Sequence, residues 1–152
     1  MKGPLKRVLY AEDSAHDVEL TLVALEQHHV ANEVVVVRDG AEAWDYLCAQ
    51  GAYADRPRGN PAVGLLDLKM PKLDGLEVLR RMRARADLRA IPVVMLTSSR
   101  EERDVIESYS LGVNAYVVKP VDFGEFMGAV ANLGLFWAVL NEPPPGSVRR
   151  AA

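Results

Sequence analysis

The sequence predicts an α/β domain built on a five-stranded parallel sheet with helices on both faces. Five short apolar runs alternate along the chain with longer segments in which apolar residues recur at helical spacing. The runs are continuously apolar, as expected for strands that are buried on both faces of a sheet. Right-handed crossovers between parallel strands then limit the possible strand orders to a few.

The five apolar runs supply the strands. Residues 7–11 and 62–66 are short runs that stop at acids, and residues 32–37 are dominated by valine. Residues 91–96 end before a Thr-Ser-Ser sequence, and residues 115–118 end before Lys-Pro. Valine and isoleucine in such runs favour strands, because branched side chains pack well on a pleated surface.

Capping residues and helical spacing bound the first and fourth helices. Ser14 is expected to cap a helix over about 14–28, because a serine hydroxyl can accept a hydrogen bond from a free N–H of the first turn. Gly112 is expected to close a helix over 101–111, because glycine readily adopts the left-handed backbone that ends many helices.

Aspartates begin the other helices. Asp39-Gly40 and Asp74-Gly75 supply turn and helix-start chemistry for the second and third helices, and Asp122 is expected to cap a last helix that reaches about residue 140. Residues 51–61, rich in glycine, proline and charge, are expected to form an exposed loop. Residues 143–152 begin with three prolines and are expected to be a disordered tail, which leaves 1–142 as one domain.

Composition excludes several classes of function. The chain has 152 residues, enough for one domain with its own core, and its net charge of -3 offers no general attraction to nucleic acid or to an anionic membrane. It contains no apolar run long enough to span a bilayer and no signal-peptide apolar stretch. We therefore expect a cytoplasmic protein that binds neither nucleic acid nor membrane. The single cysteine, Cys48, excludes an internal disulfide and is expected to be a small core residue.

Polar side chains follow four of the five predicted strands. They are Glu12, Asp13, Asp67, Thr97 and Lys119. The carboxyl ends of parallel strands meet at one edge of a sheet, so these groups are expected to converge on one cleft. Three carboxylates in one place repel one another unless a cation lies beside them, and hard oxygen ligands suit Mg²⁺ or Mn²⁺. Together with an ammonium and a hydroxyl, such a site suits phosphoryl transfer, in which an aspartate can be the acceptor.

Four motifs give the chain a family resemblance from about residue 6 to residue 140: Y-A-E-D, L-L-D-L-K-M-P-K-L-D-G, P-V-V-M-L-T-S-S and N-A-Y-V-V-K-P. It resembles the receiver domain of bacterial two-component response regulators. This resemblance implies a flavodoxin-like sheet of order 2-1-3-4-5, a sensor histidine kinase as partner, Mg²⁺-dependent self-phosphorylation from phosphohistidine, and slow hydrolysis of the product.

The resemblance also implies a role for each site residue. Asp67 would accept the phosphoryl group. The metal ligands would be Asp13, Asp67, the backbone carbonyl of Lys69, and Glu12 through a water. Thr97 and Lys119 would contact phosphoryl oxygens, Tyr116 would be the switch aromatic that fills space vacated by Thr97, and the Lys119-Pro120 peptide would be cis.

Lys69 departs from the family pattern, because a neutral or short side chain is common two positions after the acceptor. Its ammonium could contact the phosphoryl group or affect attack by water. Asp74 lies close in sequence but is expected to serve the helix start. Softer motifs, including S-A-H-D-V-E-L and L-C-A-Q-G-A-Y, resemble the single-domain regulators that serve bacterial phytochrome kinases.

The segment L-G-L-F-W-A-V-L, residues 133–140, is apolar on more sides than a surface helix needs. We expect a homodimer that uses Phe136 and Trp137, and the alternative is a helix end packed on its own domain.

Three other functions fit part of the sequence. A haloacid-dehalogenase-like phosphatase needs an acid where Lys69 stands, which argues against that function. A flavodoxin-like cofactor site would place Glu12 and Asp13 against a phosphate, which they would repel without a metal. A phosphorylation-independent interaction module remains the alternative.

Overall fold

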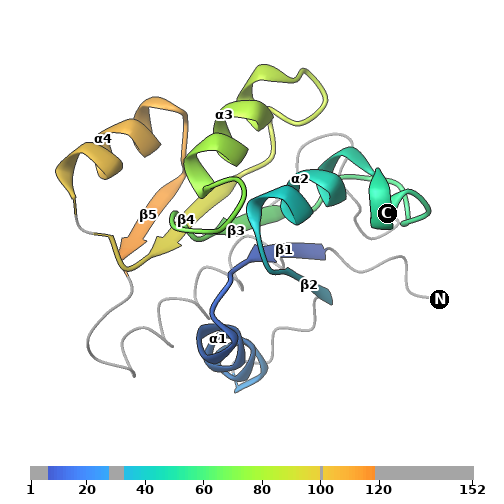
Figure 1. Cartoon of the computed structure of the whole chain (residues 1–152), viewed down its shortest axis with the longest axis horizontal. Coiled ribbons are helices and arrows are strands. Elements are labelled where there is room, and N and C mark those ends of the chain that lie inside the picture. The colour runs from blue at the N-terminus through green and yellow to red at the C-terminus, as the bar shows by residue number, and fades with distance from the viewer. Residues whose placement is uncertain (1–6, 28–32, 100, 119–152) are drawn as a thin grey trace.

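The computed structural model describes residues 7–27, 33–99 and 101–118, which form a parallel sheet with helices on both faces (Figure 1). The five strands lie in the order β2-β1-β3-β4-β5, and each neighbouring pair is parallel. The strands are β1 (Arg7–Ala11), β2 (Glu33–Val37), β3 (Val63–Leu66), β4 (Val93–Thr97) and β5 (Ala115–Val118). The predicted fold class and strand order are confirmed.

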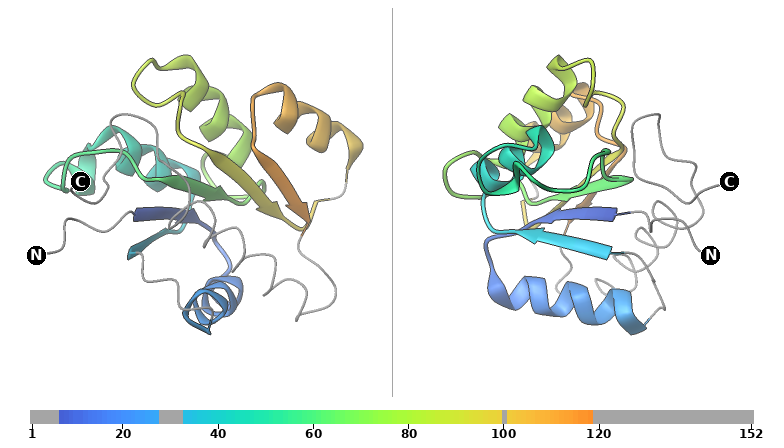
Figure 2. Two further views of the ribbon diagram at one scale, coloured as in Figure 1. Left: turned by 180° about the vertical axis from the view of Figure 1, so that it is seen from behind. Right: turned by 90° about the vertical axis from the view of Figure 1, so that its right-hand side faces the viewer.

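Helices cover the two faces of the sheet unequally within the described residues. One face carries α1 (Ala15–Gln27), and the opposite face carries α2 (Gly40–Cys48), α3 (Gly75–Ala84) and α4 (Glu102–Ser110) (Figure 2). Each helix lies between two parallel strands in sequence, as a βαβ crossover requires. No helix of the described segments is long and apolar enough to cross a membrane.

Several predictions concern residues outside the described part of the chain. They are the last helix from Asp122, the tail at 143–152, the Lys119 side chain, the cis Lys119-Pro120 peptide, and the interface at Phe136 and Trp137.

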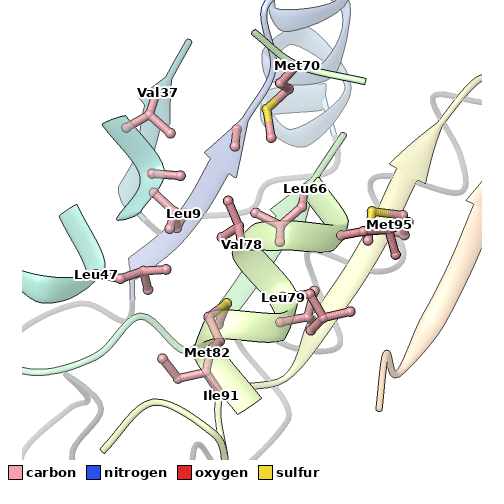
Figure 3. Close-up of a cluster of buried hydrophobic side chains, with 14 of the residues drawn as sticks. Leu9, Val37, Leu47, Leu66, Met70, Val78, Leu79, Met82, Ile91 and Met95 are labelled. Carbon is pink, nitrogen blue, oxygen red and sulfur yellow. The ribbon is translucent and has the colours of Figure 1, made fainter. Parts of the chain in front are cut away.

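The main core lies between the sheet and the helices α2 and α3. Leu9, Leu66 and Met95 project from three strands toward Leu79 and Met82 of α3 (Figure 3). A second cluster on the other face joins alternate strand residues to Val18 of α1. Side chains of a strand alternate between the two faces, so a strand covered on both must be apolar throughout. This packing explains the continuous apolar runs in the sequence.

The predicted capping residues lie at the ends of the helices. The Ser14 hydroxyl accepts a hydrogen bond from Asp17 N at 3.2 Å. Asp39 accepts one from Glu42 N at 2.7 Å, and Asp74 accepts one from Glu77 N at 2.8 Å. A residue in the left-handed region, Gly112 with φ 82°, follows the end of α4. These contacts satisfy helix-end groups that would otherwise lack partners.

The fourth strand begins two residues later and ends one residue later than predicted. It begins at Val93 instead of residue 91 and includes Thr97, which pairs with Val118 of β5. Ile91 N donates to Leu88 O at 3.1 Å and so belongs to the preceding turn. Pro92 then has no N–H to give to a strand ladder.

The loop at residues 51–61 is exposed over much of its length, but two arginines hold it in place. It opens with a short 3₁₀ turn, η1 (Gly51–Tyr53). Arg7, which is 4% exposed, donates to the Tyr46 hydroxyl at 2.7 Å and to Gly59 O at 2.8 Å. Arg56 donates to Tyr46 O at 2.6 Å, and its guanidinium lies 4.5 Å from the Tyr46 ring centroid. The first strand and α2 thereby fasten the loop.

We expect Arg7→Met to lower the free energy of unfolding by about 2–4 kcal/mol, because the buried Tyr46 hydroxyl and the partly buried Gly59 carbonyl lose their donor. Urea denaturation measures the change. Arg58→Met, at an exposed position of the same loop, is the control and should stay within about 0.5 kcal/mol of the parent. Equal losses for both variants would contradict the assignment of Arg7 as the loop's anchor.

Candidate functional site

Three acids from two neighbouring strands meet at the carboxyl edge of the sheet. Glu12 and Asp13 follow β1, and Asp67 follows β3. One carboxylate oxygen from each can be chosen so that all three lie within 4.8 Å of one another. Glu12 and Asp67 are buried, whereas Asp13 is exposed. The structure therefore brings together the three acids that the strand-end pattern predicted.

Backbone hydrogen bonds extend the sheet ladder as far as these acids. Asp67 N donates to Ala11 O at 3.0 Å, and Glu12 N donates to Val37 O at 3.0 Å. The backbone of Glu12 is thereby tied to β2, and that of Asp67 to β1. Because these bonds continue the strand pairing, the sheet holds the backbones of Glu12 and Asp67 in place.

Glu12 accepts hydrogen bonds from groups that no sequence motif indicates. Its carboxylate lies 3.3 Å from Ser14 N and 3.4 Å from the Tyr10 hydroxyl, both placed to donate. Burial, with the negative charges of Glu12, Asp17 and Asp67, raises the pKa of Tyr10 above its ordinary value, so the phenol stays protonated. Tyr10 lies in an apolar run. Its hydroxyl group is the one feature in the sequence that could have indicated a role beyond core packing, since a buried tyrosine hydroxyl usually has a hydrogen-bond partner.

The start of α3 packs directly on the backbone that carries Asp67. Gly75 N donates to Leu68 O at 2.9 Å. A Cβ atom at Gly75 would collide with the Asp67 carbonyl and would lie 3.1 Å from Leu68 Cα. Only glycine permits this close approach, which fixes where the Asp67 backbone lies.

Thr97 and Tyr116 are joined through the segment that follows β4. Thr97 is buried, and its hydroxyl accepts a hydrogen bond from Ser99 N at 3.3 Å. The half-buried Tyr116 of β5 donates its hydroxyl proton to Ser99 O at 2.9 Å. Burial raises the pKa of Tyr116, which keeps this donor protonated. The two predicted switch residues thus share one short stretch of backbone.

Lys69 and Asp74, the other two residues singled out near Asp67, point to different partners. The Lys69 side chain is 63% exposed, and its Nζ lies 4.0 Å from Asp104 Oδ2. Asp74 caps α3, as expected, with its Oδ1 on Glu77 N. Cys48, expected in the core, is half-buried on α2, and burial raises the pKa of its thiol.

The donor set of the acid cluster fits a hard divalent cation. Carboxylate oxygens are the ligands that Mg²⁺ and Mn²⁺ prefer, and a cluster this compact needs positive charge to offset its repulsion. Asp13, being exposed, leaves one side of the cluster open to water and to an incoming group.

Comparison with known proteins is consistent with this geometry. Residues 8–131 match the family described as the response regulator receiver domain. The chain is 41% identical over 135 residues to the response regulator Rcp1 of Synechocystis sp., covering 89% of this chain and 90% of that protein. The Mn²⁺-bound structure of Rcp1 has a TM-score of 0.84 at 39% identity, covering 91% of this chain and 99% of that one.

Two further solved structures are similar. The bacteriophytochrome response regulator RtBRR is 65% identical with a TM-score of 0.75, over 94% of this chain and 86% of that chain. The phosphorylated cyanobacterial phytochrome response regulator RcpA is 38% identical with a TM-score of 0.84, over 92% of this chain and 99% of that one.

We expect Gly75→Ala to lower the free energy of unfolding by about 1–3 kcal/mol, because the added methyl group meets backbone that cannot rotate away. Gly64→Ala is the matched control within β3, since its Cβ would lie 3.8 Å from Val93 Cγ2, an ordinary contact. Urea denaturation of both variants checks this. If Gly64→Ala proves the more damaging, the close approach of α3 to Asp67 is not the constraint described.

Proposed function

Because the chain belongs to the response regulator receiver domain family, whose members act in two-component phosphorelay signalling, we propose that Asp67 accepts a phosphoryl group from the phosphohistidine of a sensor histidine kinase. The observation that carries this proposal is the compact cluster of Glu12, Asp13 and Asp67 at the carboxyl edge of the sheet. The backbone of Asp67 is held in place by its hydrogen bond to Ala11 of β1 and by the close packing of Gly75 at the start of α3.

The transfer exchanges one bond for another. A carboxylate oxygen of Asp67 forms a bond to phosphorus while the bond between phosphorus and the donor imidazole nitrogen breaks. The electron pair of the broken bond stays on that nitrogen. The product is an acyl phosphate, which water later hydrolyses slowly to return the carboxylate and free phosphate. No side chain has to form a further covalent bond, so positioning and charge balance dominate.

The metal would be held by Asp13 and Asp67 directly, by Glu12 through a water, and by the backbone carbonyl of Lys69. Bound there, Mg²⁺ or Mn²⁺ supplies positive charge that offsets the acids and the incoming phosphoryl oxygens. Glu12, held by Ser14 N and the Tyr10 hydroxyl, keeps its carboxylate oriented toward the cluster. Rcp1 has been described in a Mn²⁺-bound form, which supports this part of the proposal.

The response to the phosphoryl group would involve Thr97, Lys119 and Tyr116. The Thr97 hydroxyl and the Lys119 ammonium would each contact a phosphoryl oxygen. When Thr97 turns toward that group, Ser99 N loses its acceptor, and the same segment carries the acceptor of the Tyr116 hydroxyl. A local change of charge would thereby alter the surface formed by β5 and α4.

The partner would be a kinase of the phytochrome type, which meets this regulator in the cytoplasm. Support comes from RtBRR and RcpA, which are described as phytochrome response regulators. The homodimer through Phe136 and Trp137 remains part of the proposal.

We expect incubation with acetyl phosphate and Mg²⁺ to add one phosphoryl group to the intact protein, and Asp67→Asn to prevent the addition. Intact-protein mass spectrometry, with and without Mg²⁺, measures it. If acetyl phosphate fails, a phosphorylated kinase is the second donor. A chain that neither donor phosphorylates, and whose affinity for a partner ignores Asp67→Asn, would be a phosphorylation-independent interaction module instead.

We expect Asp13→Asn to weaken Mn²⁺ binding at least about tenfold, because one anionic ligand is lost from the cluster. Isothermal titration with Mn²⁺ measures the affinity. Asp74→Asn is the matched control: Asp74 lies near Asp67 in sequence but caps α3, and asparagine is an equally good cap. Similar losses in the two variants would place the cation elsewhere.

A further inference from the structure

Asp104 is a buried acid that the proposed chemistry leaves without a role. Within the described residues, the buried charged side chains are Arg7, Glu12, Asp67 and Asp104. Arg7 fastens the loop at 51–61, and Glu12 and Asp67 belong to the acid cluster. Asp104 is 5% exposed in the first turn of α4. A carboxylate at this depth needs partners that compensate its lost hydration.

The partners of Asp104 come from the two loops that follow Asp67 and Thr97. The Ser99 hydroxyl donates to Asp104 Oδ2 at 2.6 Å, and Lys69 Nζ lies 4.0 Å from the same oxygen. Lys69 stands two residues after Asp67, and Ser99 stands two residues after Thr97. One carboxylate oxygen therefore connects the loop of the proposed phosphoryl acceptor with the loop of the proposed switch.

Helix capping explains only part of this arrangement. The N-cap residue of α4 is Glu101, which has no side-chain cap. The Ser99 hydroxyl accepts from Glu101 N at 3.4 Å, so Ser99 links Asp104 to the start of α4. A cap does not require Lys69, whose side chain is 63% exposed and comes from a different loop. The position of Lys69 Nζ, 4.0 Å from Asp104 Oδ2, is the observation that capping leaves unexplained.

We propose that Asp104 is a positioning residue for Lys69: it holds the Lys69 ammonium in the resting protein and yields it to a phosphoryl group on Asp67. This inference rests on the proposed acceptor role of Asp67. A phosphoryl group carries close to two negative charges, whereas Asp104 carries one and already accepts a hydrogen bond from Ser99. Lys69 is long and exposed enough to exchange one anion for the other.

The exchange of Lys69 would couple the phosphoryl site to α4 and Tyr116 through Ser99, in addition to the coupling through Thr97. Once Lys69 leaves, Asp104 keeps the hydrogen bond that the Ser99 hydroxyl donates to the same oxygen. Ser99 in turn offers its carbonyl to the Tyr116 hydroxyl at 2.9 Å. Coupling between two interactions is reciprocal. The factor by which a phosphoryl group weakens the Lys69–Asp104 pair is therefore also the factor by which this pair weakens the binding of a phosphoryl group.

The test compares two variants that remove different halves of the Asp104 contact. Asp104→Asn keeps an acceptor for Ser99 but removes the charge that attracts Lys69. Ser99→Ala removes the hydrogen bond but keeps that charge. Beryllofluoride, which mimics a phosphoryl group on a carboxylate, is titrated into each variant in the presence of Mg²⁺. Asp104→Asn should raise the affinity about two- to fivefold, the range typical of an exposed ion pair, and Ser99→Ala should not raise it.

Repeating Asp104→Asn in a Lys69→Gln background separates positioning from simple repulsion. If Asp104 acts through Lys69, the gain in affinity should shrink in this background. An equal gain in both backgrounds would overturn the inference, since Asp104 would then only repel the anion. A gain from Ser99→Ala as large as that from Asp104→Asn would also overturn it, since a purely structural role of the cap would explain both.

A measurement on the metal-free protein tests the resting pair without any phosphoryl chemistry. The NMR signal of the Lys69 side-chain Cε and Nζ should shift on Asp104→Asn and stay in place on Asp74→Asn. An unmoved Lys69 signal overturns the inference whether or not Asp67 is phosphorylated. The signal could also shift while Asp67 accepts no phosphoryl group from any donor. That result would contradict the proposed function, and with it the exchange of Lys69 between Asp104 and a phosphoryl group.

Discussion

The register of β1 against β3 is the constraint on which the functional edge depends. Ala11 pairs with Leu66, so the residues that follow these two strands emerge side by side. The ladder then continues one step further, from Asp67 N to Ala11 O. A slip of one residue would turn every side chain of a strand to the opposite face and would disrupt the close packing of both core clusters. The hydrophobic core therefore enforces the proximity of three acids that repel one another.

Much of this fold could be predicted from the sequence because burial on both faces leaves a simple mark. Continuous apolar runs located the strands, and the acids that follow them located the site. Ser14, Asp39 and Asp74 were recognisable as caps because their short side chains act on backbone a few residues away. The misplaced start of β4 arose because Ile91 is apolar enough for a strand, yet its N–H belongs to a turn.

The features that escaped prediction all depend on long-range contacts of polar atoms. Arg7 is the first residue of the first predicted strand and gives no sign that its guanidinium reaches Gly59, fifty-two positions away. Tyr10 reads as a core residue until its hydroxyl is placed between Glu12 and Thr21. Asp104 reads as one more acid in a helical first turn until Ser99 and Lys69 are found at the same oxygen. Most of these contacts join residues far apart in the sequence, and only the packing of the fold brings them together. No pattern of nearby residues could therefore predict them.

The fastening of the loop at 51–61 has a consequence for how this chain can vary. The carbonyl of Gly59 and the backbone of α2 are held by Arg7 and Arg56, so the path of the loop depends little on its outward side chains. Exposed positions such as Asp55 and Arg58 can therefore diverge between lineages, or carry a grafted epitope, without disturbing the acids at the opposite edge of the sheet. The molecule thus separates a region open to sequence drift from the region that selection for phosphoryl chemistry would keep constant.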